Sequence, residues 1–203
     1  MRATFNRRST PKVKDGRVQR KNRHRPTSWG GYDLDRESPE GGLRHCVTKR
    51  DVQTFVTLIS DWPRLSERLR RIRLVGHYNQ DGMYEFYYRE ETGVIQLNAW
   101  PKDLWIELRP AYFETHRMIF ERLGVSFDRL EEAVLCRFTE AQVRAYMLLH
   151  VFVHELGHHY DYMHRKPRGK SRGEGFAEEF ANRRFETLYP AYVRVFGDPA
   201  KSR

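Results

Sequence analysis

Two histidines and a glutamate, spaced as His-Glu-x-x-His, form the most informative group of reactive residues in the chain. His154, Glu155 and His158 lie in an apolar, helix-forming segment. One helical turn separates His154 from His158, so both side chains project from the same face and can bind one metal ion. Glu155, next to the first histidine, can take a proton from a water molecule at that metal. The spacing predicts a zinc hydrolase.

A catalytic zinc site also needs a third protein ligand and one open position. Two acidic candidates, Glu174 and Glu178, lie in the segment Gly-Glu-Gly-Phe-Ala-Glu-Glu that follows the motif. His164 is another candidate, because the three histidines then have the spacing of the metzincin family. Asp161 occupies the position where that family has a glycine, which allows a sharp turn after the helix. Glutamate is therefore the favoured third ligand.

The segment from Glu174 to Glu178 resembles the gluzincins, metallopeptidases of the zincin superfamily in which a glutamate on the helix after the motif binds zinc. The resemblance covers roughly residues 139–190, with weaker support from residues 72–100. It implies Glu174 as the ligand, as in the aminopeptidase branch, with Glu178 bracing a ligand histidine. In the register of the thermolysin-like branch, Glu178 would be the ligand instead. We favour Glu174 and keep Glu178 and His164 as alternates.

Other polar residues near the motif have expected supporting roles. His159 is rotated by about 100° from His158 around the helix, so we expect it to support the ligands or to face the substrate. Asp161 is expected to accept a hydrogen bond from a neighbouring histidine or to end the helix. Four tyrosines are possible donors to a developing oxyanion: Tyr160, Tyr162, Tyr189 and Tyr192.

The apolar pattern predicts the elements that precede and position this motif. A helix is expected over residues 48–61, followed after Pro63 by a short helix that carries Leu65, Leu69 and Ile72. Strands rich in β-branched and aromatic residues are expected at 72–77, 83–89 and 93–100. A further helix should run from Pro110 to Leu123, where Gly124 stops it, and a short strand should cover residues 133–138.

The motif itself is predicted to lie on a long helix. Thr139 and Gln142 form a capping-box pattern at its start, and the helix should reach Tyr162 or His164. After a basic loop, the last helix should begin at Gly173 or Glu174 and end at Pro190. We therefore predict an α+β fold: a zincin-like minimal metallopeptidase domain, with a small mixed sheet, the motif helix and a following Glu-bearing helix.

The charge of the chain is concentrated at its N-terminus. The net charge is +10, and residues 1–25 contain ten Lys or Arg and one acidic residue. We predict three regions: a disordered basic arm at 1–26, a linker rich in Gly, Pro and Ser at 27–46, and the catalytic domain at 47–203. The arm is expected either to be merely solvated or to contact nucleic acid or an acidic partner weakly.

Composition also bears on location. No run of 18 apolar residues is present, which predicts no membrane span. No apolar segment follows the charged N-terminus, which argues against secretion. Cys46 and Cys136 match no zinc spacing and are expected to be reduced, buried thiols. We therefore predict a cytoplasmic protein that does not bind membranes.

Together these features predict a zinc-dependent metallopeptidase that acts on a peptide or protein substrate. A peptide is expected to lie along the strand at residues 93–98 by edge addition. The alternative is a non-catalytic zincin-fold protein with a regulatory or binding role, whose basic arm contacts nucleic acid or an acidic partner. Whether the cleft is open to solvent distinguishes the two hypotheses.

Overall fold

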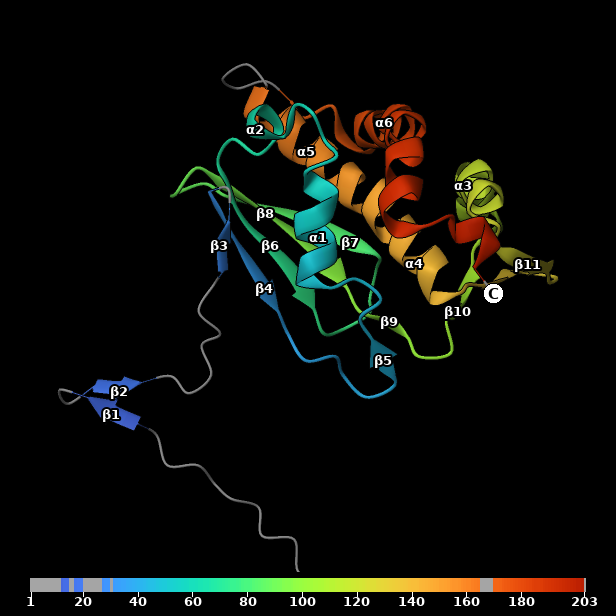
Figure 1. Ribbon diagram of the computed structural model, residues 1–203, viewed down its shortest axis with the longest axis horizontal. Helices are drawn as coiled ribbons and strands as arrows, with labels where there is room; N and C mark the ends of the chain where they lie inside the picture. Colours follow the sequence, from blue (N-terminus) through green and yellow to red (C-terminus); the bar gives the residue numbers. More distant parts are fainter. Residues whose placement is uncertain (1–11, 15–16, 20–26, 30, 165–169, 203) are drawn as a thin grey trace, which may run out of the picture.

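A computed structural model of the protein describes residues 12–14, 17–19, 27–29, 31–164 and 170–202 (Figure 1). The described part has an α+β fold, as predicted. Within the predicted basic arm, only two short segments are described, β1 (Lys12–Lys14) and β2 (Arg17–Gln19), and they pair antiparallel. The other residues of the predicted arm lie outside the described residues, so the prediction of disorder falls mostly on residues that the structure does not describe.

The largest sheet has five strands in the order β3-β4-β6-β8-β7. Its three central strands are parallel, and the outer strands β3 and β7 run antiparallel to their neighbours. Buried Leu34, Ile72 and Ile95 belong to the hydrophobic core, whereas Arg71 contacts Asp33 and Asp35 in ion pairs. The strands are β3 (Thr27–Trp29), β4 (Tyr32–Arg36), β6 (Leu69–Val75), β8 (Thr92–Asn98) and β7 (Gly82–Tyr87).

Two sequence predictions near this sheet were wrong. Residues 27–46 were expected to be a linker, yet β4 lies in the sheet beside β6, and Tyr32 and Leu34 are buried. The partner strand is distant in the sequence, so a local pattern among Gly, Pro and Ser residues could not reveal the pairing. The short helix expected to carry Leu69 and Ile72 is only α2 (Trp62–Leu65), because both residues lie in β6.

A smaller sheet and one helix form a second unit beside the main sheet. The small sheet has the order β10-β12-β11, with β10 (Trp105–Leu108), β12 (Val134–Arg137) and β11 (Ser126–Arg129). Helix α3 (Pro110–Leu123) has the predicted bounds, because proline suits its first turn and Gly124 takes a left-handed φ of 74° after its end. A separate two-stranded sheet joins β5 (Leu43–Arg44) to β9 (Trp100–Pro101).

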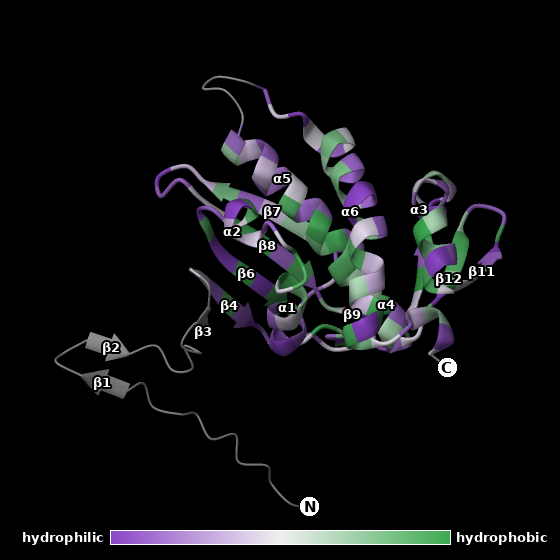
Figure 2. Cartoon of the chain, turned by 45° about the horizontal axis from the view of Figure 1, so that its top comes forward, coloured by the Kyte–Doolittle hydropathy of each residue, from purple (hydrophilic) through white to green (hydrophobic). Residues whose placement is uncertain are grey.

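The motif lies on a long helical segment, as predicted. It begins as α4 (Glu140–Tyr146), widens into the π-helical turn η1 (Met147–Val151) and continues as α5 (Phe152–His164). The Thr139–Gln142 capping box is confirmed, with Gln142 N–H donating to Thr139 Oγ1 at 3.3 Å and Thr139 N–H to Gln142 Oε1 at 2.7 Å. In Figure 2, α5 runs between the main sheet and α6. Its buried Phe152, Val153 and Leu156 contribute to the core.

Two other helices hold this arrangement in place. Helix α1 (Lys49–Val56) packs Phe55 against Phe152 of α5, with ring centroids 6.0 Å apart. Helix α6 (Gly173–Phe196) is tied to the start of α2 by Arg184, which donates to both Asp61 oxygens at 2.9 and 2.7 Å. A short 3-10 turn, η2 (Pro199–Lys201), follows.

The prediction that Pro190 ends the last helix was wrong, because Pro190 lies inside α6. Proline removes one backbone hydrogen bond and disfavours a helix interior. Here the flanking Tyr189 and Tyr192 are buried in the core, and their packing keeps the chain helical.

Two predictions drawn from composition can be compared with the structure. Cys46 and Cys136 are free and buried, as expected. In the part of the chain that the structure describes, no helix is both long and apolar enough to cross a membrane.

Candidate metal centre

Three predicted ligand residues converge at one point. His154 Nε2 lies 3.2 Å from His158 Nε2 and 3.1 Å from Glu174 Oε2. Glu174 Oε1 is 3.4 Å from His158 Nε2. Ligand atoms bound about 2 Å from a tetrahedral zinc ion lie roughly 3.3 Å apart. The three residues therefore fit a metal ion without rearrangement of the helices.

Local structure explains why these atoms meet. The two histidines are one turn apart on α5, and Glu174 stands in the first turn of α6. Gly157, between the histidines, lets α6 approach closely: a Cβ atom at this position would lie 3.1 Å from the Ala177 Cα. The glycine inside the motif thus brings the glutamate-bearing helix to the histidines.

Glu178 has a different place from Glu174. Its Oε2 accepts a hydrogen bond from His154 Nδ1–H at 3.2 Å, and its Oε1 accepts one from Asn182 Nδ2 at 3.1 Å. A proton on Nδ1 of the neutral His154 ring leaves the lone pair on Nε2, where the three candidate ligands meet. Glu178 therefore contacts the nitrogen of His154 opposite to the candidate ligand atom, which is the position that its expected supporting role requires. Burial would raise the pKa of Glu178, but the neighbouring His116, His154 and His150 lower it overall.

Glu155 faces the same cavity as the ligand group. The cavity has a volume of 1060 Å³, and its lining includes Glu155, both motif histidines and Glu174. Glu155 is only 7% exposed, and burial raises its pKa to about 7. A carboxyl group with such a pKa can exchange a proton near neutral pH, as a general base requires.

His159 does not have the predicted supporting or substrate-facing role. Its ring is fully buried between helix and sheet, where Nε2–H donates to the Glu67 carbonyl at 2.8 Å. Its Nδ1 accepts from the Tyr84 hydroxyl at 3.1 Å. Burial lowers the pKa of His159 to about 4, which keeps the ring neutral. His159 therefore holds Tyr84, which lines the cavity. The contact to the candidate ligand His154 comes from Glu178 instead.

Asp161 neither bonds to a histidine nor ends the helix. It is 2% exposed and accepts hydrogen bonds from Ser171 Oγ at 2.9 Å, Arg172 N–H at 2.8 Å and Arg172 Nε at 2.5 Å. These residues directly precede α6. Asp161 therefore fixes the start of the helix that carries Glu174.

His164 does not join the metal centre. Helix α5 continues through Asp161 without a turn, and His164 Nδ1–H donates to the Tyr160 carbonyl at 2.9 Å. The four tyrosines predicted as oxyanion donors also lie elsewhere, since the lining of the cavity includes none of Tyr160, Tyr162, Tyr189 and Tyr192.

The cavity is instead lined by a partly buried acid, Asp81, and two tyrosines that were not among the predicted site residues. Tyr112 and Tyr146 place their hydroxyls 2.9 and 3.0 Å from Asp81 Oδ2, and 2.8 Å from each other. Burial raises the pKa of Asp81. In the sequence, Asp81 lies between the strands predicted at residues 72–77 and 83–89. Nothing local indicates that α3 and α4 would supply its partners.

The strand that borders the cavity is β7, whereas residues 93–98 were expected to bind the peptide. Those residues belong to β8, which lies between β6 and β7 and has both edges paired. Gly82, Met83 and Tyr84 of β7 line the cavity, and β7 is the outer strand of the sheet. A Cβ atom at Gly82 would lie 2.6 Å from a Val151 methyl carbon, so this glycine permits close packing of β7 on the motif helix.

Comparisons of the chain with known protein families, with curated proteins and with solved structures found no match. The function is therefore inferred from the geometry and chemistry of the site.

Proposed function

We propose that the protein is a zinc-dependent metallopeptidase with a gluzincin-like zincin fold. The observation that carries the proposal is the convergence of His154, His158 and Glu174 beside Glu155 in one cavity. The two Nε2 atoms and the Glu174 carboxylate would hold the ion. Zinc, when bound, supplies a Lewis acid that acidifies water and polarises a carbonyl group.

Glu155 is the proposed residue that transfers protons during the reaction. In the proposed reaction its carboxylate accepts a proton from the attacking water and then passes that proton to the leaving amine. The buried position and raised pKa of Glu155 suit both transfers. Tyr112 supplies a hydroxyl in the same cavity that would donate to the negative oxygen formed during attack after turning its proton away from Asp81.

The proposed substrate is an extended peptide. The outer edge of β7 offers main-chain donors and acceptors beside the cavity, which a peptide can pair with as an added strand. Glu174, whose side chain is 83% exposed, stands where the cavity meets solvent. The peptide bond to be cleaved would therefore enter the cavity from the side of α6.

Replacing the proposed base tests this function. We expect Glu155→Gln to lower peptide hydrolysis by at least about 100-fold, because the amide cannot accept the proton, while zinc remains bound. Hydrolysis of an unfolded protein and a peptide mixture is followed by mass spectrometry, and zinc is measured by elemental analysis. Glu179→Gln is the matched control, since Glu179 is an exposed residue of α6 that pairs with Arg183.

Peptide cleavage by Glu155→Gln at the wild-type rate would refute the proposed mechanism. If the wild-type protein binds zinc yet cleaves none of the peptides, the result would favour the alternative of a non-catalytic zincin-fold protein. Binding of nucleic acid or acidic proteins by residues 1–26 would then be the next measurement.

A further inference from the structure

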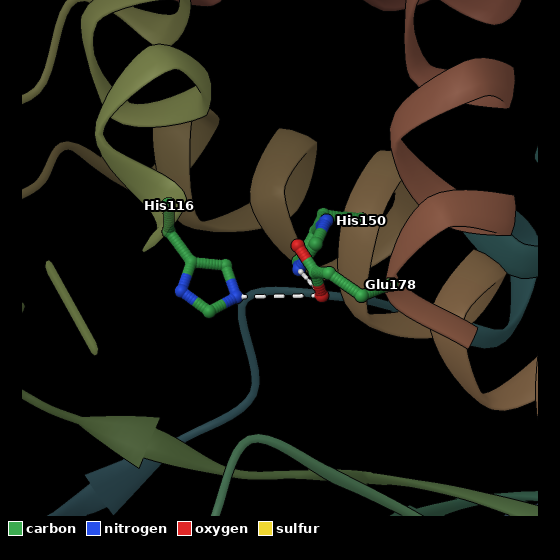
Figure 3. Close-up of side chains that lie close together, drawn as sticks. All are labelled: His116, His150 and Glu178. Carbon is green, nitrogen blue, oxygen red and sulfur yellow. Dashed lines mark ion pairs between the residues drawn. The ribbon is translucent and has the colours of Figure 1, made fainter. Parts of the chain in front are cut away.

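A second group of metal-ligand side chains lies deeper in the same cavity. His116 of α3, His150 of the π-helical turn η1 and Glu178 of α6 converge on one point (Figure 3). Glu178 Oε2 is 3.7 Å from His116 Nε2 and 3.6 Å from His150 Nε2. We propose that these three residues form a second binding site for a divalent transition-metal ion that favours imidazole ligands, such as zinc.

The hydrogen bonds of His116 direct a lone pair toward Glu178. Its Nδ1 lies 2.8 Å from the Tyr112 carbonyl oxygen, which can only accept, so Nδ1 carries the proton. In the neutral ring, Nε2 then presents its lone pair to the carboxylate. Two acceptors facing each other at 3.7 Å form no hydrogen bond. A cation between them satisfies both.

His150 supplies the second independent observation. The residue is 2% exposed, and its Nδ1 is buried without a hydrogen-bond partner. Its Nε2 is aimed at Glu178 but is 3.6 Å away, beyond a normal hydrogen bond. A metal ion between Nε2 and the Glu178 carboxylate would give this buried ring one strong interaction and would fix its tautomer, with the proton on Nδ1.

The distances from Glu178 Oε2 to the two histidine Nε2 atoms fit coordination of a shared metal ion better than direct hydrogen bonds. Ligand atoms about 2 Å from one tetrahedral zinc ion lie roughly 3.3 Å apart. The three ligand atoms here lie within 4.8 Å of one another, so small side-chain movements close the site. Two histidines and one glutamate also form a ligand set that zinc uses in proteins.

The π-helical turn gives the backbone reason for this second group. A π turn holds an additional residue and changes which residues share a helix face, and such turns often occur at functional sites. Met147–Val151 forms such a turn, and His150 belongs to it. His150 and His154 are one turn apart and both face Glu178 Oε2, yet their rings belong to different candidate ligand groups.

A metal ion at this position links three helices. It would tie α3 to the motif helix and to α6, and so connect the two walls of the cavity. Glu178 belongs to both sites, because the oxygen that faces His116 and His150 also accepts from His154. The inference concerns metal binding alone and does not require peptide hydrolysis.

Counting bound metal tests the proposal. The full chain is stripped with a chelator, reloaded with zinc, desalted and analysed by elemental mass spectrometry. We expect two zinc ions per wild-type chain. His116→Asn should bind one, because the Asn amide can still donate to the Tyr112 carbonyl while the Nε2 ligand is gone. Glu174→Gln should also bind one, and the double variant none.

His164→Asn is the matched control. His164 has the same local bond as His116, from Nδ1–H to the carbonyl four residues earlier, but it lies outside the cavity lining. This variant should still bind two ions. Circular dichroism confirms that each variant is folded, and anomalous scattering at the zinc edge locates each ion directly.

The outcomes separate the two sites. One zinc ion in the wild type that persists in His116→Asn and disappears in Glu174→Gln would overturn the second site and leave the proposed peptidase site intact. One ion that disappears in His116→Asn and persists in Glu174→Gln would uphold the second site and refute the first. A count of one for His164→Asn would show that the loss in His116→Asn is unspecific, which would also overturn the proposal.

Discussion

Glu178 is the residue on which the polar network of the cavity depends. One of its oxygens contacts His154, His150 and His116, and the other accepts from Asn182. Neighbouring Glu174, one helical turn earlier, contacts the Nε2 atoms of the motif histidines. The two glutamates therefore have distinct proposed roles, because Glu174 faces Nε2 of the His154 ring and Glu178 faces Nδ1.

Asp161 is the residue that fixes the start of α6, the helix that carries Glu174. We expect Asp161→Asn to lower the free energy of unfolding by about 2 kcal/mol at pH 7, since bonds to a buried charged acceptor are replaced by weaker ones. Zinc affinity at the first site should fall as well, because Arg172 and Glu174 lose a fixed position. Chemical denaturation and zinc titration measure the two effects.

The effect of Asp161 should depend on pH. Burial would raise its pKa, but hydrogen bonds from Arg172 and Ser171 lower it overall. A carboxyl group whose pKa is lower in the folded state contributes stability above its unfolded value of about 3.9. That contribution is lost as the pH falls through the folded pKa. The difference between wild type and Asp161→Asn should therefore shrink below about pH 4; a constant difference down to acid pH would contradict this account.

At the scale of elements, the contact between α5 and α6 sets the distance between the histidines and Glu174. Gly157 faces the Ala177 backbone and the Phe180 side chain, with a Cβ atom expected at 3.1 and 3.2 Å from them. A single methyl group requires small shifts there. A larger side chain requires the two helices to separate.

We expect Gly157→Leu to cost about 1–3 kcal/mol of stability and to abolish zinc binding at the first site, because α6 must move away from α5. Gly157→Ala should have a much smaller effect, since a gain in helix propensity of about 1 kcal/mol opposes the crowding. Thermal melts and zinc titration are the measurements. Gly41→Leu is the control, because open space surrounds Gly41. Wild-type zinc affinity in Gly157→Leu would refute the argument.

At the scale of the whole molecule, the cavity lies where separate elements meet. Its lining includes residues of β7, β10, α3, the motif helix and the start of α6. The proposed ligands come from α5 and α6 at the first site and from α3, η1 and α6 at the second, so bound metal would link these elements. A ligand that binds only the folded state adds to its stability.

Metal removal should therefore destabilise the whole fold. We expect the melting temperature to fall when a chelator removes zinc and to rise again with added zinc. Each independent site should contribute about 2.7 kcal/mol at a zinc concentration 100 times its Kd. Differential scanning calorimetry of wild type and Glu174→Gln is the measurement, with a smaller gain in the variant. A melting temperature that does not respond to zinc would argue against both metal sites.

The sequence alone determined the features that near neighbours encode. Helical spacing placed His154 and His158 on one face with Glu155 beside them, and the Thr139 capping box and Gly124 predicted where helices begin and end. Each of these depends on residues within about one helical turn of one another. The α+β class followed from the same local periodicities.

Only the tertiary structure decided the features that depend on distant partners. It placed β4 in the sheet, kept Pro190 inside α6, and brought His116 and His150 to Glu178. It also placed Glu174 beside the Nε2 atoms of both motif histidines and Glu178 beside Nδ1 of His154. The physical reason is that the approach of α6 to α5 and of α3 to both is fixed by packing between residues far apart in the chain, and no local pattern contains that information.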